Sequence, residues 1–286
     1  MLRLLLLAFS LALSSEPSGP SLAEASSRFA TLDGHRIHYK TLGSGSGKEA
    51  VFFVHGWTCD MSVWRFQAPA FAKDRRVIVV DLPGHGGSDA PEIDYTMALF
   101  ARSIDAVMRE EGVSRVVLVG HSMGTPVVRE FYRLHPEKTS ALVAVDGSFR
   151  VLVSDPAARE KFLAPFRGPE YREALARFAD LSFPPEQAAL RDSMKTVMTK
   201  TPQHVLVSAA QSMLDPANFR EDSIRVPLLN VLAKSPFWTE DDEAFLRKLA
   251  PGVDYRIMDG AGHFLMLQKA EEFNAMLSAF LAKQRG

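Results

Sequence analysis

The segment best suited to chemistry is residues 120–124, Gly-His-Ser-Met-Gly, which directly follows the apolar run Val116–Val119. The apolar run predicts a buried strand, and the stretch Thr125 to Leu134 predicts a helix. A Gly-x-Ser-x-Gly turn between a strand and a helix pushes the serine out over the sheet, at a helix N-terminus whose dipole favours negative charge. The flanking glycines leave room where a Cβ would clash. Ser122 is therefore a candidate nucleophile, with the backbone N–H of Met123 beside it.

A serine hydroxyl attacks well only when an adjacent base removes its proton, and histidine is the usual base. Among the 8 histidines, His263 is the best candidate because it lies in a glycine-rich loop, residues 260–264, between a predicted strand and the last predicted helix. His121 directly precedes Ser122, but a rigid turn points adjacent side chains in different directions, which favours a structural or pocket-lining role. We expect the other six to bond backbone groups or to lie on the surface or in the core: His35, His38, His55, His85, His135 and His204.

The chain beyond its N-terminus alternates short β-rich runs with helical stretches, the pattern of an α/β fold whose mostly parallel sheet is covered by helices. A hairpin is predicted across Asp33-Gly34. The predicted strands are Phe29 to Leu32, Arg36 to Lys40, Ala50 to Val54, Val77 to Val80, Arg115 to Val119, Ala141 to Val145, Leu228 to Val231 and Asp254 to Ile257. The predicted helices between and after them are Thr96 to Glu111, Thr125 to Leu134, Glu240 to Leu249 and Ala270 to Leu281.

The alternation stops between Gly147 and Arg225, and an all-helical insertion between two strands is a cap. Its predicted helices are Asp155 to Phe162, Glu170 to Phe178, Glu186 to Thr199 and Gln203 to Met213. The chain therefore divides into a first core part, residues 26–148, a cap, residues 149–224, and a second core part, residues 225–286. Some Phe and Met side chains of the cap are candidates for an apolar pocket, and most are expected only to pack between helices.

The N-terminus has the features of a secretory signal peptide. A short basic start precedes the apolar run Leu4 to Leu13, which is too short to span a bilayer comfortably, and Ala23-Glu24-Ala25 offers a cleavage site. Residues 1–25 are accordingly predicted to be a signal peptide outside the fold. The mature protein is expected to be secreted or periplasmic, without a membrane span. An uncleaved anchor and a flexible tail are the alternatives.

Composition argues against several classes of partner and cofactor. Lys and Arg total 33 against 34 Asp and Glu, a formal net charge of -1, so no electrostatic feature favours nucleic acid or an anionic membrane. The single cysteine, Cys59, forms no internal disulfide and is expected to be a small buried apolar residue. No His and carboxylate pair occurs at metal-ligand spacing, so neither a metal nor a cofactor is predicted. The expected partner is a small molecule, and the oligomeric state is not indicated.

Four segments occur in an order typical of one family. They are Val54-His55-Gly56-Trp57, then Asp81-Leu82-Pro83-Gly84-His85-Gly86-Gly87-Ser88, then residues 120–124, and finally residues 260–264. On these motifs the chain resembles the α/β-hydrolase family, in its cap-bearing branch of esterases, lipase-like enzymes and carbon-carbon bond hydrolases. The resemblance implies a mostly parallel sheet flanked by helices, with the helical cap inserted after the sixth core strand. It also implies that the loop of His263 reaches back over Ser122.

The resemblance further implies an oxyanion hole, in which two backbone N–H groups stabilise the negative charge that grows on a carbonyl oxygen. Met123 supplies one of these groups. Trp57, in the His-Gly-x segment, supplies the other, and its ring is a candidate wall of the acyl pocket.

The acid that orients the histidine is displaced in this chain. Family members usually carry it after the strand that is here Leu228 to Val231, but residues 232–239 contain no carboxylate. We place the acid at Asp146, at the end of the strand that follows the nucleophile helix. Asp241 or Asp242, and then a dyad without an acid, are the alternatives.

The expected activity is hydrolysis of carboxylic esters of small to medium apolar substrates through an acyl-enzyme on Ser122. Carbon-carbon bond hydrolases, lactonases and perhydrolases of this fold also use a serine and are alternatives, and export disfavours the first. Dehalogenases and epoxide hydrolases use a carboxylate nucleophile, so Ser122 argues against both. Because the acid after Val231 is missing, a non-catalytic ligand-binding protein is a further alternative. His263 and the intact serine motif argue against it.

Overall fold

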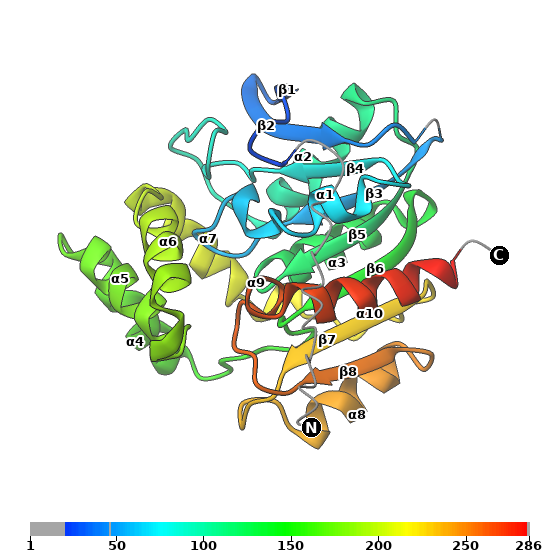
Figure 1. Ribbon diagram of the computed structural model, residues 1–286. Helices are drawn as coiled ribbons and strands as arrows, with labels where there is room; N and C mark the ends of the chain where they lie inside the picture. Colours follow the sequence, from blue (N-terminus) through cyan, green and yellow to red (C-terminus); the bar gives the residue numbers. More distant parts are fainter. Residues whose placement is uncertain (1–20, 46, 285–286) are drawn as a thin grey trace, which may run out of the picture.

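The computed structural model describes residues 21–45 and 47–284, and its centre is an eight-stranded sheet in the order β1-β2-β4-β3-β5-β6-β7-β8 (Figure 1). The strands are β1 (Ser27–Leu32), β2 (His35–Leu42), β3 (Glu49–Val54), β4 (Val77–Val80), β5 (Arg115–His121), β6 (Thr139–Val145), β7 (Leu228–Ala233) and β8 (Asp254–Met258). The pairs β1–β2 and β2–β4 are antiparallel, and all other neighbours are parallel. Every predicted strand is present, and the mostly parallel sheet is confirmed.

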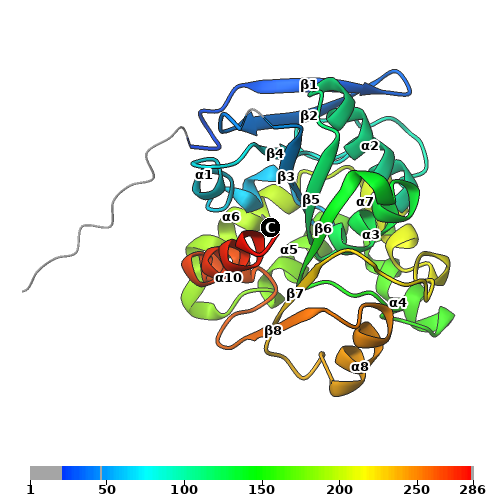
Figure 2. The ribbon, with the colours of Figure 1, turned by 90° about the vertical axis from the view of Figure 1, so that its right-hand side faces the viewer.

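Helices cover both faces of this sheet (Figure 2). On one side lie α1 (Ala68–Phe71), α9 (Leu265–Gln268) and α10 (Ala270–Ala282), and on the other lie α2 (Met97–Glu110), α3 (Gly124–Leu134) and α8 (Glu240–Leu249). Side chains of β3 alternate between the two cores: Phe53 packs with α10, and Phe52 packs with α2 and α3. Because both faces are covered, the central strands contain continuous apolar runs, such as residues 50–54 in β3 and 116–119 in β5, as the sequence indicated.

The cap lies between β6 and β7, to the left of the sheet in Figure 1. It consists of α4 (Pro156–Arg167), α5 (Tyr171–Leu181), α6 (Ala188–Met198) and α7 (Gln203–Met213), with short 3-10 turns at Pro185–Gln187 and Pro216–Asn218. All four predicted cap helices are present. The third begins at Ala188 rather than Glu186 because Pro185–Gln187 forms the 3-10 turn instead.

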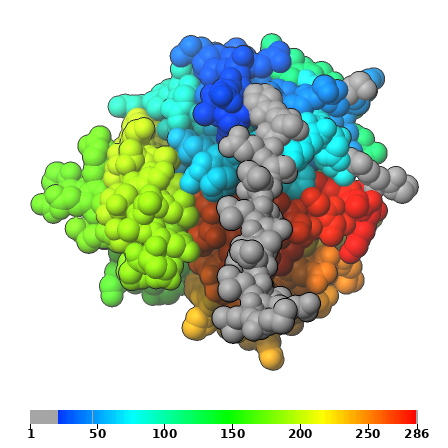
Figure 3. Space-filling view, viewed as in Figure 1, coloured from blue at the N-terminus to red at the C-terminus, as the bar shows by residue number. Residues whose placement is uncertain are grey.

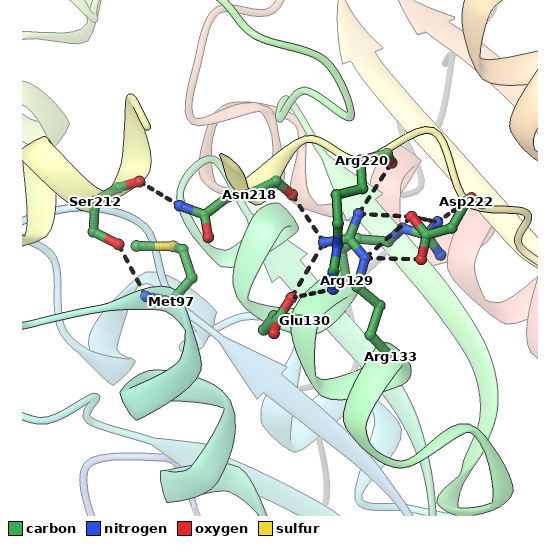
Figure 4. A network of polar contacts seen from close by, with 8 residues as sticks. All are labelled: Met97, Arg129, Glu130, Arg133, Ser212, Asn218, Arg220 and Asp222. Carbon is green, nitrogen blue, oxygen red and sulfur yellow. Dashed lines mark hydrogen bonds and ion pairs between the residues drawn. The ribbon is translucent and has the colours of Figure 1, made fainter. Parts of the chain in front are cut away.

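The cap's return segment, residues 218–222, leads the chain back to the core and is held to α3 by a network of charged side chains (Figure 4). Arg133 donates to the backbone carbonyls of Asn218 at 2.8 Å and Arg220 at 3.1 Å, and to the Asp222 carboxylate at 2.9 Å. Arg129, which is 3% exposed, also donates to Asp222 at 2.8 Å. The helix that follows Ser122 and begins at Gly124 therefore also positions the segment through which the chain leaves the cap.

Residues 21–25 pack onto the folded body, although the sequence placed the first 25 residues outside it. Leu22 is 4% exposed and belongs to the core beside α1 and α10. The Lys40 ammonium donates to the carbonyls of Leu22 and Ala23, each at 3.0 Å. The physical reason is that one buried leucine and a paired lysine offset the cost of ordering a short turn.

The rest of the predicted signal peptide, including the apolar run Leu4 to Leu13, lies outside the described residues. Its cleavage and its end point stay predictions. Among residues 21–45 and 47–284, none of the helices combines the length and the apolar character that crossing a bilayer requires.

We predict that a chain beginning at Ser26 is less stable than one beginning at Ser21. Loss of the buried Leu22 side chain lowers the free energy of unfolding by about 2 kcal/mol, since burying a leucine contributes about 1.5–3 kcal/mol. Urea unfolding of both chains measures the difference. The matched control is Leu22→Ala in the longer chain, which should reproduce most of the loss. Equal midpoints for the two chains would contradict the packing of Leu22.

Two buried histidines shape the loops after β3 and β4, and both bond backbone groups as predicted. His55 donates from Nδ1 to the Gly56 carbonyl at 2.8 Å, and its Nε2 accepts from the Leu82 N–H at 3.0 Å. His85 donates from Nδ1 to the Pro83 carbonyl at 2.9 Å. Burial lowers the pKa of both rings, and for His85, with the nearby His55 also disfavouring the charged form, the pKa falls to about 3. Both rings are therefore neutral in the folded protein.

We predict that the protein loses stability as the pH falls below about 6.5. In the unfolded chain the pKa of His85 is near its ordinary value of 6.5, whereas in the fold its pKa is about 3. The unfolded state thus binds the proton first, and His85 alone lowers the free energy of unfolding by up to about 1.4 kcal/mol per pH unit. Urea unfolding between pH 7.5 and 5, a window above the range of most carboxylates, measures the slope. His85→Gln should reduce the slope by that amount, and an unchanged slope would show that His85 is protonated in the fold.

Candidate active site

Ser122 lies in a strained turn between β5 and α3. Its φ is 52°, and its N–H donates to the Val145 carbonyl at 2.9 Å. A Cβ at Gly120 would lie 2.4 Å from the Gly124 carbonyl oxygen, and a Cβ at Gly124 would lie 2.7 Å from the Val54 carbonyl oxygen. Side chains at either position would force the turn apart. The two glycines therefore have the steric role that the sequence motif predicted.

His263 connects Ser122 to Asp146. Its Nε2 lies 3.0 Å from the Ser122 Oγ, and its Nδ1 lies 2.7 Å from Asp146 Oδ2. A carboxylate only accepts, so Nδ1 carries the proton and Nε2 is left to accept from the serine hydroxyl. The three residues come from the ends of β5 and β6 and from the loop after β8, and they form one directional hydrogen-bond chain.

Asp146 is fixed by the loop that lacks the usual family acid. The side chain is 8% exposed, and its Oδ1 accepts from the Ala233 N–H at 2.9 Å and from the Trp238 indole N–H at 3.0 Å. Its backbone has φ 45°, and its N–H donates to the Val231 carbonyl at 2.8 Å. The loop after β7 thus supplies hydrogen-bond donors to a displaced carboxylate instead of a carboxylate of its own. Nothing in the sequence indicated that Trp238 binds the Asp146 carboxylate.

Neither alternative acid bonds His263. Asp242 caps α8, where its Oδ2 accepts from the Thr239 N–H and hydroxyl, each at 2.8 Å, and its Oδ1 pairs with Arg150 at 2.6 Å. Asp241 is exposed in the first turn of the same helix. Carboxylates at this position stabilise a helix N-terminus. Asp241 and Asp242 are therefore wrong as candidates for the acid beside His263.

The segment after β3 lies directly against Ser122. A Cβ at Gly56 would lie 3.0 Å from the Ser122 Cβ, so only glycine fits between the two segments. In the described part of the chain, the N–H groups of Trp57 and Met123 have no hydrogen-bond acceptor. The Trp57 ring points into the cap, where its indole N–H donates to the Leu206 carbonyl at 2.9 Å, and it does not line the pocket. The expectation that this ring lines the acyl pocket is wrong, because its hydrogen bond to Leu206 holds it against α7.

A pocket of about 640 Å³ opens above Ser122 and His263, between the core and the cap. More of the cap's Phe and Met side chains line this pocket than the sequence suggested. They are Phe162, Phe178, Phe183, Met213 and Phe219. Phe166, Met194 and Met198 are buried between helices instead. Three exposed apolar side chains, Leu152, Leu181 and Phe237, also line the pocket. Among the described residues, the ionisable side chains of its lining are Asp146, His263 and Lys234.

His121 anchors the loop that carries His263. The ring is buried, and its Nε2 donates to the backbone carbonyl of His263 at 2.8 Å. Burial, reinforced by the neighbouring His263, lowers the pKa of His121 well below its ordinary value. The residue is therefore a neutral tether, in agreement with the structural role assigned to it.

Cys59 is buried, as expected, and burial raises the pKa of its thiol, which leaves it protonated at neutral pH. Within residues 21–45 and 47–284, no group of three or more His, Cys, Asp or Glu side chains is placed to bind a metal ion.

Comparison with known proteins agrees with this geometry. A family model described as the alpha/beta hydrolase family matches residues 51–276. The chain is 26% identical over 282 residues to the dihydrolipoyllysine-residue acetyltransferase component of the acetoin cleaving system of Cupriavidus necator, which covers 93% of this chain and 72% of that protein. It is 29% identical over 256 residues to the pimeloyl-(acyl-carrier protein) methyl ester esterase of Edwardsiella ictaluri, which covers 82% of this chain and 94% of that protein.

A solved structure of an N-acyl homoserine lactone degrading enzyme superimposes with a TM-score of 0.75 and 26% identity, and covers 88% of this chain and 100% of that one. The family model matches well over half of the chain, across both core parts and the cap between them. This protein belongs to the alpha/beta hydrolase family.

Proposed function

We propose that this protein is a serine hydrolase that cleaves carboxylic esters of small to medium apolar substrates through an acyl-enzyme. The observation that carries the proposal is the hydrogen-bond chain from Ser122 Oγ through His263 to Asp146, with distances of 3.0 and 2.7 Å, at the floor of an apolar pocket. A nucleophile, a base and an orienting acid in this order perform acyl transfer.

The reaction begins when Ser122 Oγ attacks the ester carbonyl while its proton passes to His263 Nε2. Negative charge grows on the carbonyl oxygen, where the N–H groups of Trp57 and Met123 stabilise it. His263 then gives the proton to the departing alcohol, which leaves Ser122 acylated. A water molecule, deprotonated by the same histidine, attacks the acyl group and releases the acid. Asp146 stabilises the imidazolium in both halves of the cycle.

The pocket supports an apolar substrate of limited size. Its volume of about 640 Å³ falls in the range of small-molecule sites, and its aromatic and aliphatic lining favours an uncharged acyl or aromatic group. The relative from Edwardsiella ictaluri is a methyl ester esterase at 29% identity. This likeness supports esters as the substrate class.

A lactone is a second candidate substrate, and the structural similarity to an N-acyl homoserine lactone degrading enzyme at 26% identity favours it. A lactone is a cyclic ester, so Ser122 and His263 would act on it without any change of role. The acyl chain of such a molecule fits the same apolar lining.

We also propose that the protein works outside the cytoplasm, in the periplasm or as a secreted enzyme. The support is the basic start and apolar run of residues 1–13, followed by a small-residue cleavage motif at residues 23–25. Edman sequencing of the exported protein would locate the cleavage point.

We predict that wild type releases p-nitrophenol from short- and medium-chain p-nitrophenyl esters. Ser122→Ala abolishes this turnover, and Asp146→Asn lowers kcat by about 10⁴-fold, as in other triads, because His263 loses its orienting acceptor. The matched control is Asp241→Asn, the same chemical change at an exposed carboxylate, which keeps full activity. Turnover that survives in Ser122→Ala would refute the proposed nucleophile, and equal losses in both Asp variants would refute the role of Asp146.

We further predict ring opening of N-hexanoyl homoserine lactone, followed by base uptake in a pH-stat because each opened ring releases one proton. Both ester and lactone activities should disappear in Ser122→Ala, since they share the nucleophile. A wild type that turns over p-nitrophenyl esters but leaves the lactone intact would eliminate the second candidate and keep the first.

A further inference from the structure

A second hydrogen-bonded Ser-His-Asp set lies on the outer hairpin of the sheet, apart from the pocket. His38 Nε2 lies 2.8 Å from the Ser27 Oγ, and His38 Nδ1 lies 2.7 Å from Asp81 Oδ2. The corresponding distances around His263 are 3.0 and 2.7 Å. Ser27 belongs to β1 and His38 to β2, and Asp81 directly follows β4.

Asp81 is a buried, charged acceptor. It is 2% exposed, and besides His38 its carboxylate accepts from the N–H groups of Met61 at 2.7 Å and Gly87 at 2.8 Å. Burial acts to raise the pKa of Asp81, but these hydrogen bonds outweigh it and lower the pKa below its ordinary value. An ionised carboxylate only accepts, so His38 Nδ1 carries the proton and Nε2 accepts from the Ser27 hydroxyl.

The His38 ring is fixed between its neighbours, while the serine is open to solvent. A Cβ at Gly87 would lie 2.6 Å from His38 Nδ1, and the Phe29 ring lies 5.2 Å from the imidazole on the strand beside it. The His38 side chain is 13% exposed, and Ser27 is exposed. A base that is already oriented therefore lies beside a hydroxyl that small molecules can reach from solvent.

Lys40 adds a positive charge to the same face. It is directly opposite Ser27 in the antiparallel pairing of β1 and β2, and directly opposed side chains lie on one face with Cβ atoms about 5 Å apart. Two of its three N–H groups donate to the carbonyls of Leu22 and Ala23, each at 3.0 Å.

We propose that Ser27, His38 and Asp81 form a second nucleophilic site, at which small activated acyl or phosphoryl donors from solvent modify Ser27 covalently. Ser27 Oγ attacks the donor, its proton passes to His38 Nε2, and the leaving group departs. With a fluorophosphate, an O–P bond forms as the P–F bond breaks and fluoride leaves. With an activated ester, an acyl group is transferred and the alcohol takes the proton from His38.

The modification should be stoichiometric. Ser27 is the first residue of β1, so it lacks the tight turn and the helix N-terminus that lie beside Ser122. Without them a tetrahedral intermediate gains little stabilisation, and only donors with good leaving groups react. This inference is independent of the proposed esterase activity.

The test uses the chain that begins at Ser21 and carries Ser122→Ala, which keeps the contacts of Leu22 and Ala23 with Lys40 and prevents reaction in the pocket. The protein is incubated with diisopropyl fluorophosphate, and peptide mapping by mass spectrometry gives the rate of labelling at each serine. We expect Ser27 to react about 100-fold or more faster than Ser140, because general-base assistance is worth about 10²–10⁴-fold. Ser140 is the internal control, a serine whose hydroxyl bonds a carboxylate, Glu49, with no imidazole.

A second substitution tests the base. His38→Gln, in the Ser122→Ala chain, should slow labelling of Ser27 about 100-fold while the labelling of Ser140 stays the same. If Ser27 in the Ser122→Ala chain is labelled no faster than Ser140, the proposal is overturned. This outcome does not depend on whether the His38 variant folds. A rate at Ser27 that His38→Gln leaves unchanged would overturn the role of His38.

Discussion

The hydrogen bond between His263 and Asp146 is the interaction on which the rest of the site depends. It joins the end of β6 to a loop more than a hundred residues later, and it sets which nitrogen of the imidazole carries the proton. Only a neutral Nε2 accepts from Ser122. The parallel sheet makes the interaction possible, because the carboxyl ends of β5, β6 and β7 meet at one edge.

The position of the acid changes which hydrogen-bonding groups the neighbouring loops contribute. With Asp146 at the end of β6, the loop after β7 is freed from supplying a carboxylate, and it contributes the Ala233 and Trp238 N–H groups instead. Trp238 also lines the pocket, so the same side chain orients the acid and borders the substrate space. The positive φ of both Ser122 and Asp146 places backbone strain at these two strand ends.

The cap forms one side of the pocket above this hydrogen-bond chain. Its helices pack on one another, and its return segment is fixed to α3 through Arg129 and Arg133, so the helix that presents Ser122 also positions one pocket wall (Figures 1 and 4). The Ser27 set has similar hydrogen-bond distances but no cap, no tight turn and no helix N-terminus. Figure 3 shows the cap, in green, against the left side of the core, with the blue segment of β1 and β2 at the top and the orange C-terminal segment at the bottom. Surroundings, rather than hydrogen-bond distances, distinguish the two sites.

From the sequence alone we could predict the strands, the helices, the cap and the Ser122 and His263 pair, because these depend on local patterns: apolar runs, glycine spacing and motif order. The family resemblance already favoured Asp146, but only the fold separates it from Asp241 and Asp242, since the three carboxylates have the same chemistry and differ in which one the strand order brings to His263. The packing of Leu22, the direction of the Trp57 ring and the meeting of Ser27 with His38 and Asp81 are likewise tertiary outcomes. The contacts of Trp57 with Leu206 and of His38 with Asp81 join segments far apart in the chain, which local sequence patterns do not encode.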